Sequence, residues 1–359
     1  MNRREFVRLG AGVTLGLAAE SASAARGNSE ECLRFCLFAD IHYYPGVYPH
    51  DTAEWLDRIL DRAQREKAAF VMHLGDFAHE PKNCLAYVDR YNDCGIPAYH
   101  VLGNHDCDGN TYEETLAAYR LARGYYHFDA GGWRFVVLDT NYCCMDGQFF
   151  HYSLANYPGH HLYWRSHDRS DLAGHTLSDT RVPPEQLAWF ADIVEKSQHP
   201  CVIASHASFE RANGSPDSAA VRKIIDDTNR RHPGRIRLVL NGHHHRDHVR
   251  ILENVIYVDV NSANYDWFLK EHDKYPASYV KKWQNVRHCI FWDDPISAMV
   301  SLYPSGRICF EGQRSRFHMG ITPSATGNNP YDRAGRPTSA EIQSFNIWGG
   351  TGERRGLSK

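Results

Sequence analysis

Five short apolar segments in this chain each end in a group of polar residues, and this repeated arrangement constrains the fold more than any other feature. Each segment has the length of one buried strand, and the polar residues follow at once. Asp, His and Asn seldom pack a hydrophobic core, so their placement needs another explanation. The five groups lie in the stretches FADIH, HLGDF, LGNHD, IASH and LNGHHH.

Helical segments separate most of these strands, and further strands follow. The predicted strands are 33–40, 70–76, 97–104, 201–206 and 235–243, with later ones at 287–292, 297–303 and 307–312. The predicted helices are 51–69, 81–93, 111–122, 183–197 and 218–231. Hairpins are expected at 125–140, turning at Gly131-Gly132, and at 248–260, turning at Glu253-Asn254. Alternating strands and helices, followed by a run of strands, predict an α/β sandwich of layered sheets.

Ligands of open α/β sheets gather at the carboxyl ends of the strands, so the five groups are expected to build one polar site. Its candidate side chains are those of Asp40, His42, Asp76, Asn104, His105, Asp106, His206, His243 and His245. Alternation along an extended chain puts Asp40 and His42 on the same side. The same rule pairs His243 with His245 and turns His244 away.

The chemistry of these side chains indicates a metal site. Carboxylate, imidazole and amide ligands without a thiolate suit Mn, Fe or Zn. About seven ligands are too many for one ion, but they suit two ions roughly 3.5–4 Å apart that share a carboxylate. The sequence therefore predicts two divalent or trivalent metal ions as cofactors.

In this order, D-x-H, G-D, G-N-H-D, H and G-H-x-H, the chain resembles the calcineurin-like metallophosphoesterase superfamily from Asp40 to His245. The segment EQLAWF (185–190) is similar to one in the cyclic-nucleotide-phosphodiesterase-like branch, although such a helix also suits simple packing. The resemblance implies a four-layer α/β/β/α sandwich of two mixed sheets flanked by helices.

The resemblance also implies a role for each candidate residue. One metal would be held by Asp40, His42 and His245, the other by Asn104, His206 and His243, with Asp76 bridging them. A hydroxide that bridges the two ions would be the nucleophile. His105 would be the general acid at the leaving oxygen, with Asp106 orienting its ring. The implied enzyme hydrolyses phosphate mono- or diesters of small molecules, such as nucleotides or other organophosphates.

Two other functions are weighed against this hydrolase. The first is a non-catalytic metal-binding module that recognises a partner, but His105 and Asp106 are intact. The second is a nuclease. A formal charge of −3, from 40 basic and 43 acidic residues, and the absence of a basic stripe argue against extended nucleic-acid binding.

Several histidines are interpreted as ordinary residues rather than ligands. His79 occupies the position at which the purple acid phosphatase branch has a Tyr ligand. A place behind the metal ligands, without contact to a metal, is one interpretation of His79, but we expect it to lie at the surface. His73, His100 and His127 lie in predicted strands without a motif around them.

The phosphoesterase domain is expected to cover 30–315, with an insertion at 141–182 and an irregular C-terminal tail at 320–359. The insertion is rich in His and aromatic residues, which fits either a substrate lid or a locally packed excursion. Among ten cysteines, Cys36 and Cys201 are expected in the core, and the fold is not expected to depend on disulfides. No segment has the length and hydrophobicity of a transmembrane helix.

The N-terminus resembles a twin-arginine export signal of the bacterial type. Arg3-Arg4 precede a mildly apolar run from Leu9 to Ala19, and Ala22-Ser23-Ala24 gives an A-x-A cleavage pattern. The sequence therefore predicts export to the bacterial periplasm or the medium.

We expect the mature protein in a native bacterial host to lack residues 1–24, because the signal would be cleaved after Ala24. Intact-mass measurement of the exported protein checks this expectation. Exported protein that still carries Met1 would contradict it.

Overall fold

The computed structural model describes residues 31–153, 177–348 and 354–355, with the exception of residues 212, 269, 284 and 333–334. The predicted export signal at 1–24 and residues 154–176 of the insertion, predicted as a substrate lid or a packed excursion, lie outside the described residues.

The first of two large sheets has seven strands in the order β18-β17-β16-β15-β1-β2-β3. Strands β1, β2 and β3 run parallel, whereas β15 pairs antiparallel with β1 and with β16, so the sheet is mixed. The strands are β1 (Leu33–Phe38), β2 (Val71–His73), β3 (Ala98–His100), β15 (Ala298–Leu302), β16 (Arg307–Gly312), β17 (Phe345–Trp348) and β18 (Arg354–Arg355).

The second large sheet has six strands in the order β11-β12-β10-β9-β5-β4. Its central strands β5, β9, β10 and β12 are parallel, and the two edge strands pair antiparallel. Both predicted hairpins form here, as β4–β5 and β11–β12. The strands are β4 (Tyr126–Ala130), β5 (Trp133–Leu138), β9 (Cys201–Ser205), β10 (Ile236–Asn241), β11 (His248–Leu252) and β12 (Val255–Asp259).

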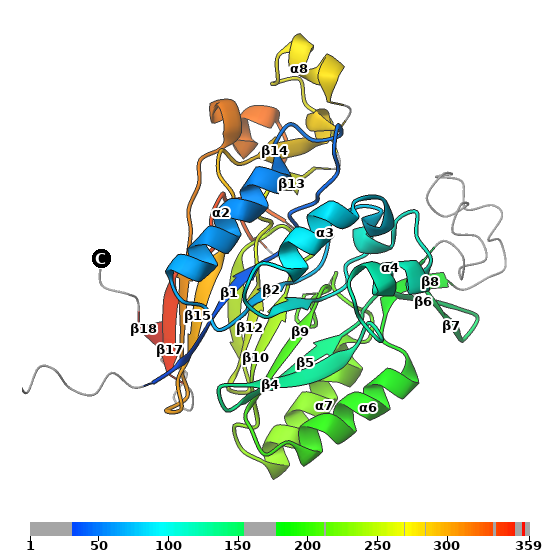
Figure 1. Cartoon of the computed structure of the whole chain (residues 1–359), viewed down its shortest axis with the longest axis vertical. Coiled ribbons are helices and arrows are strands. Elements are labelled where there is room, and N and C mark those ends of the chain that lie inside the picture. The colour runs from blue at the N-terminus through cyan, green and yellow to red at the C-terminus, as the bar shows by residue number, and fades with distance from the viewer. Residues whose placement is uncertain are drawn as a thin grey trace, which may run out of the picture. The chain divides into compact units, whose positions relative to one another are not determined.

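Helices cover the outer faces of both sheets, as Figure 1 shows for α2 and α3 beside β1 and β2, and for α6 and α7 beside β5 and β9. Two helix starts show the local chemistry that favours a helix N-terminus. The side chain of Asp51 accepts two backbone N–H groups at the start of α2, and Pro184 begins α6. The helices are α2 (Thr52–Arg65), α3 (Leu85–Asn92), α4 (Tyr112–Ala118), α6 (Pro184–Lys196), α7 (Ser218–Arg231) and α8 (Ala277–Lys282).

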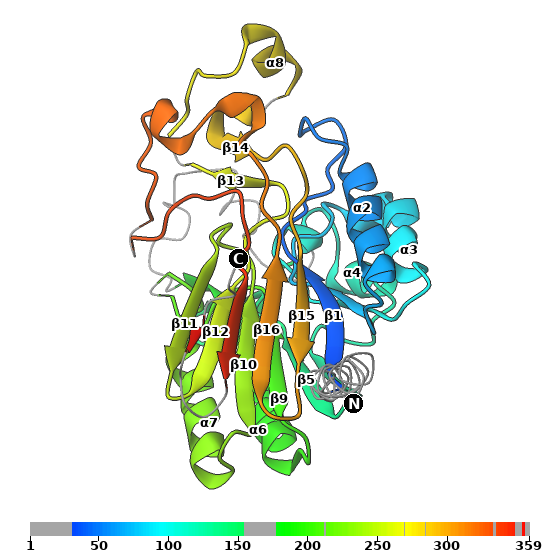
Figure 2. The same cartoon turned by 90° about the vertical axis from the view of Figure 1, so that its left-hand side faces the viewer.

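The two sheets pack face to face, with β15 and β16 in front of β9 and β10 in Figure 2. Strand β5 shows how its sheet is buried on both sides: Phe135 and Val137 pack between the sheets, whereas Val136 and Leu138 pack toward α6 and α7. The four-layer α/β/β/α arrangement predicted for the chain is thus present.

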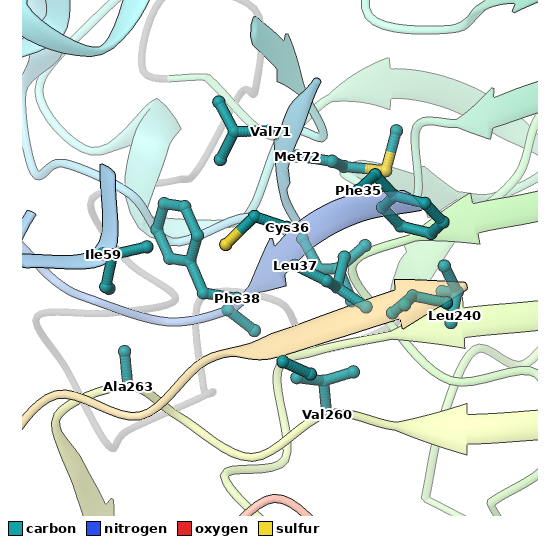
Figure 3. Packing of buried hydrophobic residues seen from close by; sticks show 14 of the residues in the cluster. Phe35, Cys36, Leu37, Phe38, Ile59, Val71, Met72, Leu240, Val260 and Ala263 are labelled. Carbon is teal, nitrogen blue, oxygen red and sulfur yellow. The ribbon is translucent and has the colours of Figure 1, made fainter. Parts of the chain in front are cut away.

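Strand β1 is buried on both faces, because it lies between helix α2 and the second sheet. Figure 3 shows Leu37 and Phe38 on opposite sides of β1, with Ile59 of α2 on the side of Phe38. At the same strand, the Phe35 ring meets Phe135 of the second sheet edge-on, with centroids 5.4 Å apart. This core fixes the register of one sheet against the other.

Two smaller sheets were not predicted in this form. Part of the insertion at 141–182 forms a three-stranded sheet of β6 (Tyr142–Met145), β7 (Gln148–His151) and β8 (Leu177–Arg181). The described end of the insertion is packed, since His151 is buried with its Nε2 3.2 Å from Oδ2 of Asp139. Strands β13 (Tyr265–Trp267) and β14 (Cys289–Phe291) form a two-stranded sheet.

The C-terminal segment is only partly the irregular tail that we expected. Strand β17 pairs with β16 and extends the first sheet. The described residues of the segment 330–343 before it have little regular structure, but their backbone is held against the strand ends. Asn261 donates to the carbonyls of Ser339 and Glu341, and the Gln343 N–H donates to Asp247.

A buried ion-pair network holds the same segment. The Arg336 guanidinium donates to Asp259 and to Glu210, each at 2.7 Å, and all three side chains are buried. Arg211 pairs with Asp332 beside them. Glu210 also pairs with Arg250, whereas Asp259 has its ion pair with Arg336. A buried carboxylate without a partner is costly, so Asp259 depends on Arg336.

The described residues, which include all ten cysteines, contain no disulfide. Cys36 and Cys201 are buried in the core, as predicted. Within the same residues, no helix combines the length and the apolar character needed to cross a membrane.

We expect Arg336→Ala to lower the free energy of unfolding by about 3–5 kcal/mol, because it leaves the buried Asp259 without its ion-pair partner and leaves Glu210 with Arg250 alone. Urea denaturation of both proteins measures the change. The matched control is Arg58→Ala, which breaks the exposed ion pair with Asp294 and should cost at most about 1 kcal/mol. Equal losses in both variants would contradict this account of the network.

Candidate metal centre

The polar residues that follow five strands meet at one edge, where the ends of the two large sheets come together. Asp40 and His42 follow β1, Asp76 follows β2, and Asn104 follows β3 in the first sheet. His206 follows β9, and His243 and His245 follow β10 in the second sheet. Contacts across this seam include the His243 N–H, which donates to the Asp40 carboxylate at 3.0 Å.

Several of these side chains extend from backbone in the left-handed region. The φ angles are 52° at Asp40, 52° at His42, 50° at Asp76, 70° at His243 and 51° at His245. Strand alternation is therefore not what groups these residues. His244 lies outside the donor groups that the described residues form. Left-handed residues other than Gly cost about 1–3 kcal/mol each and concentrate at functional sites.

The first donor group consists of Asp40, His42 and His245, all of which are buried. Nε2 of His42 lies 3.1 Å from Nε2 of His245, and the latter lies 3.3 Å from Oδ1 of Asp40. One donor atom from each of the three side chains thus lies within 4.8 Å of the others, which is close enough for them to share a cation.

The second donor group consists of Asp76, His206 and His243. Nε2 of His206 lies 3.2 Å from Oδ2 of Asp76 and 3.1 Å from Nδ1 of His243. The same Oδ2 of Asp76 is 3.8 Å from Nε2 of His42. Asp76 therefore lies between the two groups, in the place predicted for a bridging carboxylate.

The surroundings of the Asn104 side chain indicate whether these residues fit a metal ion. Its Oδ1 is buried and meets no hydrogen-bond donor among the described residues. A buried carbonyl oxygen without a partner is costly, and ligation of a cation would satisfy it. The donor set of carboxylate, imidazole and amide, without thiolate, fits Mn, Fe or Zn.

Two glycines make the close packing of these loops possible. A Cβ on Gly103 would lie 2.2 Å from Oδ1 of Asp76, and a Cβ on Gly75 would lie 2.3 Å from Nδ1 of His206. Gly75 also has a φ of 96°. In each case the glycine of one motif leaves the space that a donor from another motif occupies.

Neighbouring groups orient the donors and favour their charge state. His206 donates from Nδ1 to the Leu74 carbonyl at 2.7 Å, which leaves Nε2 free for the site. Burial opposes the charge of Asp76, but His206, His105 and His42 outweigh it and hold the pKa of Asp76 well below its usual range. Asp76 is therefore an anion at neutral pH.

His105 lies at the edge of the site, and its side chain is 39% exposed. The backbone N–H of His105 donates to Oδ1 of Asp76 at 2.8 Å. Burial opposes a charged ring, but Asp76 and Asp108 raise the pKa of His105 to about 9. Bound cations would lower that pKa again through their charge.

The prediction that Asp106 orients the His105 ring is wrong. Nδ1 of His105 bonds instead to Oδ2 of Asp108 at 2.7 Å. Residues 105–107 form a short 3₁₀ turn, in which side chains three apart lie over one another, so Asp108 stands beside His105 and Asp106 points elsewhere. The spacing of three residues between His105 and Asp108 was the sequence feature from which this contact could have been predicted.

Asp106 has a structural role. Its carboxylate accepts the N–H groups of Phe77, Ala78 and Gly103 and the hydroxyl of Tyr119, at 2.6–3.0 Å. These bonds join the loop after β2 to the loop after β3. Burial and the neighbouring Asp76 raise the pKa of Asp106 to about 7, against the effect of these bonds.

The expectation of a surface His79 is also wrong. His79 is 8% exposed, and its Nε2 lies 3.1 Å from Nδ1 of His42. The loops after β1 and β2 continue side by side, since Tyr43 donates to the Phe77 carbonyl and His79 donates to the Tyr43 carbonyl. This pairing brings His79 to His42, and no local sequence pattern reveals it.

The other three histidines interpreted as ordinary residues, His73, His100 and His127, are a buried hydrogen-bonded pair and an exposed side chain. Nε2 of His73 lies 2.7 Å from Nδ1 of His100, whose other nitrogen meets Asn92, and burial lowers the pKa of both rings. His127 is exposed on β4. The segment 185–190 is used for packing, because the Gln186 amide pairs with both backbone groups of Asp139.

Comparison with known proteins agrees with this geometry. The family model described as calcineurin-like phosphoesterase matches residues 33–247, more than half of the 359-residue chain. A search of curated protein sequences gave no match.

Solved structures with a similar fold include a dimetal phosphatase from Danio rerio, with a TM-score of 0.53 and 16% identity over 79% of this chain and 96% of that one. PhoD has a TM-score of 0.49 and 16% identity over 93% and 73% of the two chains. GAP50, the anchor in the inner membrane complex of Plasmodium, has a TM-score of 0.44 and 16% identity over 79% and 85%.

The match over residues 33–247 carries all five motifs whose side chains meet at the seam between the sheets. The chain therefore belongs to the calcineurin-like phosphoesterase family, and it is a metal-dependent hydrolase of phosphoester bonds.

Proposed function

We propose that this protein hydrolyses phosphate mono- or diesters of small molecules, nucleotides among them, at a dinuclear metal centre. The observation that carries the proposal is the position of Asp76, whose Oδ2 lies 3.8 Å from His42 of one donor group and 3.2 Å from His206 of the other. A single structural ion needs only about four ligands and no shared carboxylate.

The proposed ligands of one metal are Asp40, His42 and His245, and those of the other are Asn104, His206 and His243. Asp76 is the ligand common to both. Mn, Fe or Zn would suit these donors. Bound cations supply Lewis acidity at the phosphoryl oxygens and lower the pKa of a water molecule toward neutrality.

The remaining step, protonation of the leaving oxygen, is assigned to His105. Its Nδ1 bonds to Asp108, so its Nε2 is the nitrogen available to a substrate. In the proposed reaction Nε2–H donates a proton to the leaving oxygen, while Asp108 holds the ring and stabilises its charge. The exposed position of His105 at the edge of the site supports this role, because a leaving group must reach solvent.

We further propose that the protein is exported and that it belongs to the cyclic-nucleotide-phosphodiesterase-like branch. The twin arginines and the A-x-A pattern support export. The sequence similarity of EQLAWF supports the branch, although Gln186 of this segment also serves packing through its hydrogen bonds to Asp139. The lack of a basic stripe in the sequence supports small substrates over nucleic acid.

Metal removal tests the proposal directly. We expect metal-loaded protein to hydrolyse an aryl phosphate or an aryl phosphodiester, chelation to abolish the activity, and Mn²⁺, Zn²⁺ or Fe²⁺ to restore it. Asp76→Asn removes the charge shared by both donor groups, so metal content and activity should fall together for every substrate.

Elemental analysis after dialysis and kcat/KM measure these two quantities. The control is His244→Gln, which changes a histidine between two proposed ligands but outside the donor groups and should keep its metal. Full activity in metal-free protein would overturn the dinuclear proposal.

His105→Ala should bind metal normally but lose rate. General acid catalysis contributes about 10²–10⁴-fold, so the loss in kcat/KM should fall in that range for an alkyl phosphate. An activated aryl phosphate needs little protonation and should lose less. Equal losses on both esters, or a loss of metal in this variant, would refute the role of His105 as the general acid.

A further inference from the structure

A chain of hydrogen-bonding groups runs from a proposed metal ligand to the proposed general acid. It begins at His42, whose Nδ1 lies 3.1 Å from Nε2 of His79. Nδ1 of His79 lies 3.3 Å from Oδ2 of Asp108, and the same oxygen lies 2.7 Å from Nδ1 of His105. In the sequence analysis a place behind the metal ligands was the less favoured interpretation of His79, and Asp108 was given no role.

The direction of each hydrogen bond follows from the metal site. Nε2 of His42 faces His245 and Asp40, so it must present a lone pair if a cation binds there. A neutral imidazole has one N–H, and in His42 it must then be on Nδ1. His42 therefore donates to Nε2 of His79, which must be without a proton.

The same reasoning fixes the next two rings. Since Nε2 of His79 accepts, its proton is on Nδ1, which donates to Asp108. Oδ2 of Asp108 then accepts two imidazole N–H groups, one from His79 and one from His105. With Nδ1 of His105 engaged, Nε2 is directed to the substrate side.

We propose that His79 and Asp108 are positioning residues that couple the orientation of metal ligand His42 to that of general acid His105. This inference rests on the proposed function. Asp108 alone would orient His105, but the link through His79 makes a single carboxylate oxygen hold both rings. A shift at either end is transmitted through bonds of fixed direction to the other end.

The surroundings of His79 make it suited to this task. The Tyr44 ring stacks on it with centroids 4.4 Å apart and planes 9° apart, and the His105 ring lies 4.5 Å away. Since His79 is also buried, its ring plane is fixed by packing on its faces. A ring held in this way keeps both of its nitrogens in line with their partners.

Three variants test the coupling. His79→Phe keeps the ring but removes both nitrogens, whereas His79→Gln provides a carbonyl acceptor for His42 and an N–H donor for Asp108. Asp108→Asn weakens the acceptor at the other end. His127→Phe, a change at an exposed strand histidine, is the matched control.

We expect His79→Phe to lower kcat/KM for an alkyl phosphate by about 10–100-fold, in the range found for groups that orient metal ligands. The loss on an aryl phosphate should be smaller, because the proton donor matters less there. His79→Gln should recover most of the rate. His79→Phe combined with Asp108→Asn should cost no more than the worse single variant, since both break one chain.

A readout independent of turnover is the protonation pattern of the rings. In Zn²⁺-loaded protein labelled with ¹⁵N-histidine, NMR should show that Nδ1 of His79 is protonated and that its Nε2 is not. The signal is assigned by its absence in His79→Gln. A proton on Nε2 of His79 would overturn the proposal, since His42 could not then donate to it.

Metal stoichiometry distinguishes the positioning role of His79 from a rival explanation, a third metal site. The donor atoms of His79, His105 and Asp108 lie close enough together to hold an ion themselves. Loss of one Zn²⁺ per chain in His79→Phe would mean a third metal site and would refute the positioning role. If wild-type protein has no activity on either ester, the proposed function fails, but the NMR measurement still decides the hydrogen-bond chain.

Discussion

The carboxylate of Asp76 is buried between imidazoles that come from two different sheets, and the surrounding chain is arranged to support its charge. An unpaired buried carboxylate is strongly unfavourable. Here His206, His42 and the backbone N–H of His105 all approach it, and a second buried carboxylate, that of Asp40, lies 4.0 Å from the same Nε2 of His42. So much negative charge and so many lone pairs in one place are best compensated by cations, which explains why the site also presents Asn104.

Because its donors come from both sheets, the site depends on the core that joins them. Asp40, Asp76 and Asn104 follow strands of the first sheet, whereas His206 and His243 follow strands of the second. Contacts such as that of Phe35 with Phe135 hold the sheets in register, and a small slip would separate the donor groups. The rigid core also keeps left-handed backbone in place at several donors, which no single loop could sustain by itself.

The sequence was sufficient to predict the layered fold, the helices and hairpins, and the residues that gather at the seam. These features follow from local periodicity and from the rule that ligands bind at the ends of strands. The position of His79 could not be predicted in this way, because it depends on two loops that run side by side. Asp108 was missed because the 3₁₀ turn was not recognised. The pairing of β17 and the burial of Arg336 depend on partners far away in the chain.

The close packing of donor side chains against Gly75 and Gly103 limits how the loops of such a site can be exchanged between relatives. The space at Gly103 is filled by Asp76, and the space at Gly75 is filled by His206. Each loop therefore packs against a surface that another loop forms. A loop grafted alone from a relative would meet surfaces shaped for a different neighbour. Exchange between relatives is therefore expected to succeed only when whole sets of loops move together. Variation in substrate preference has more freedom in peripheral segments, such as the insertion after β5, than in the motifs themselves.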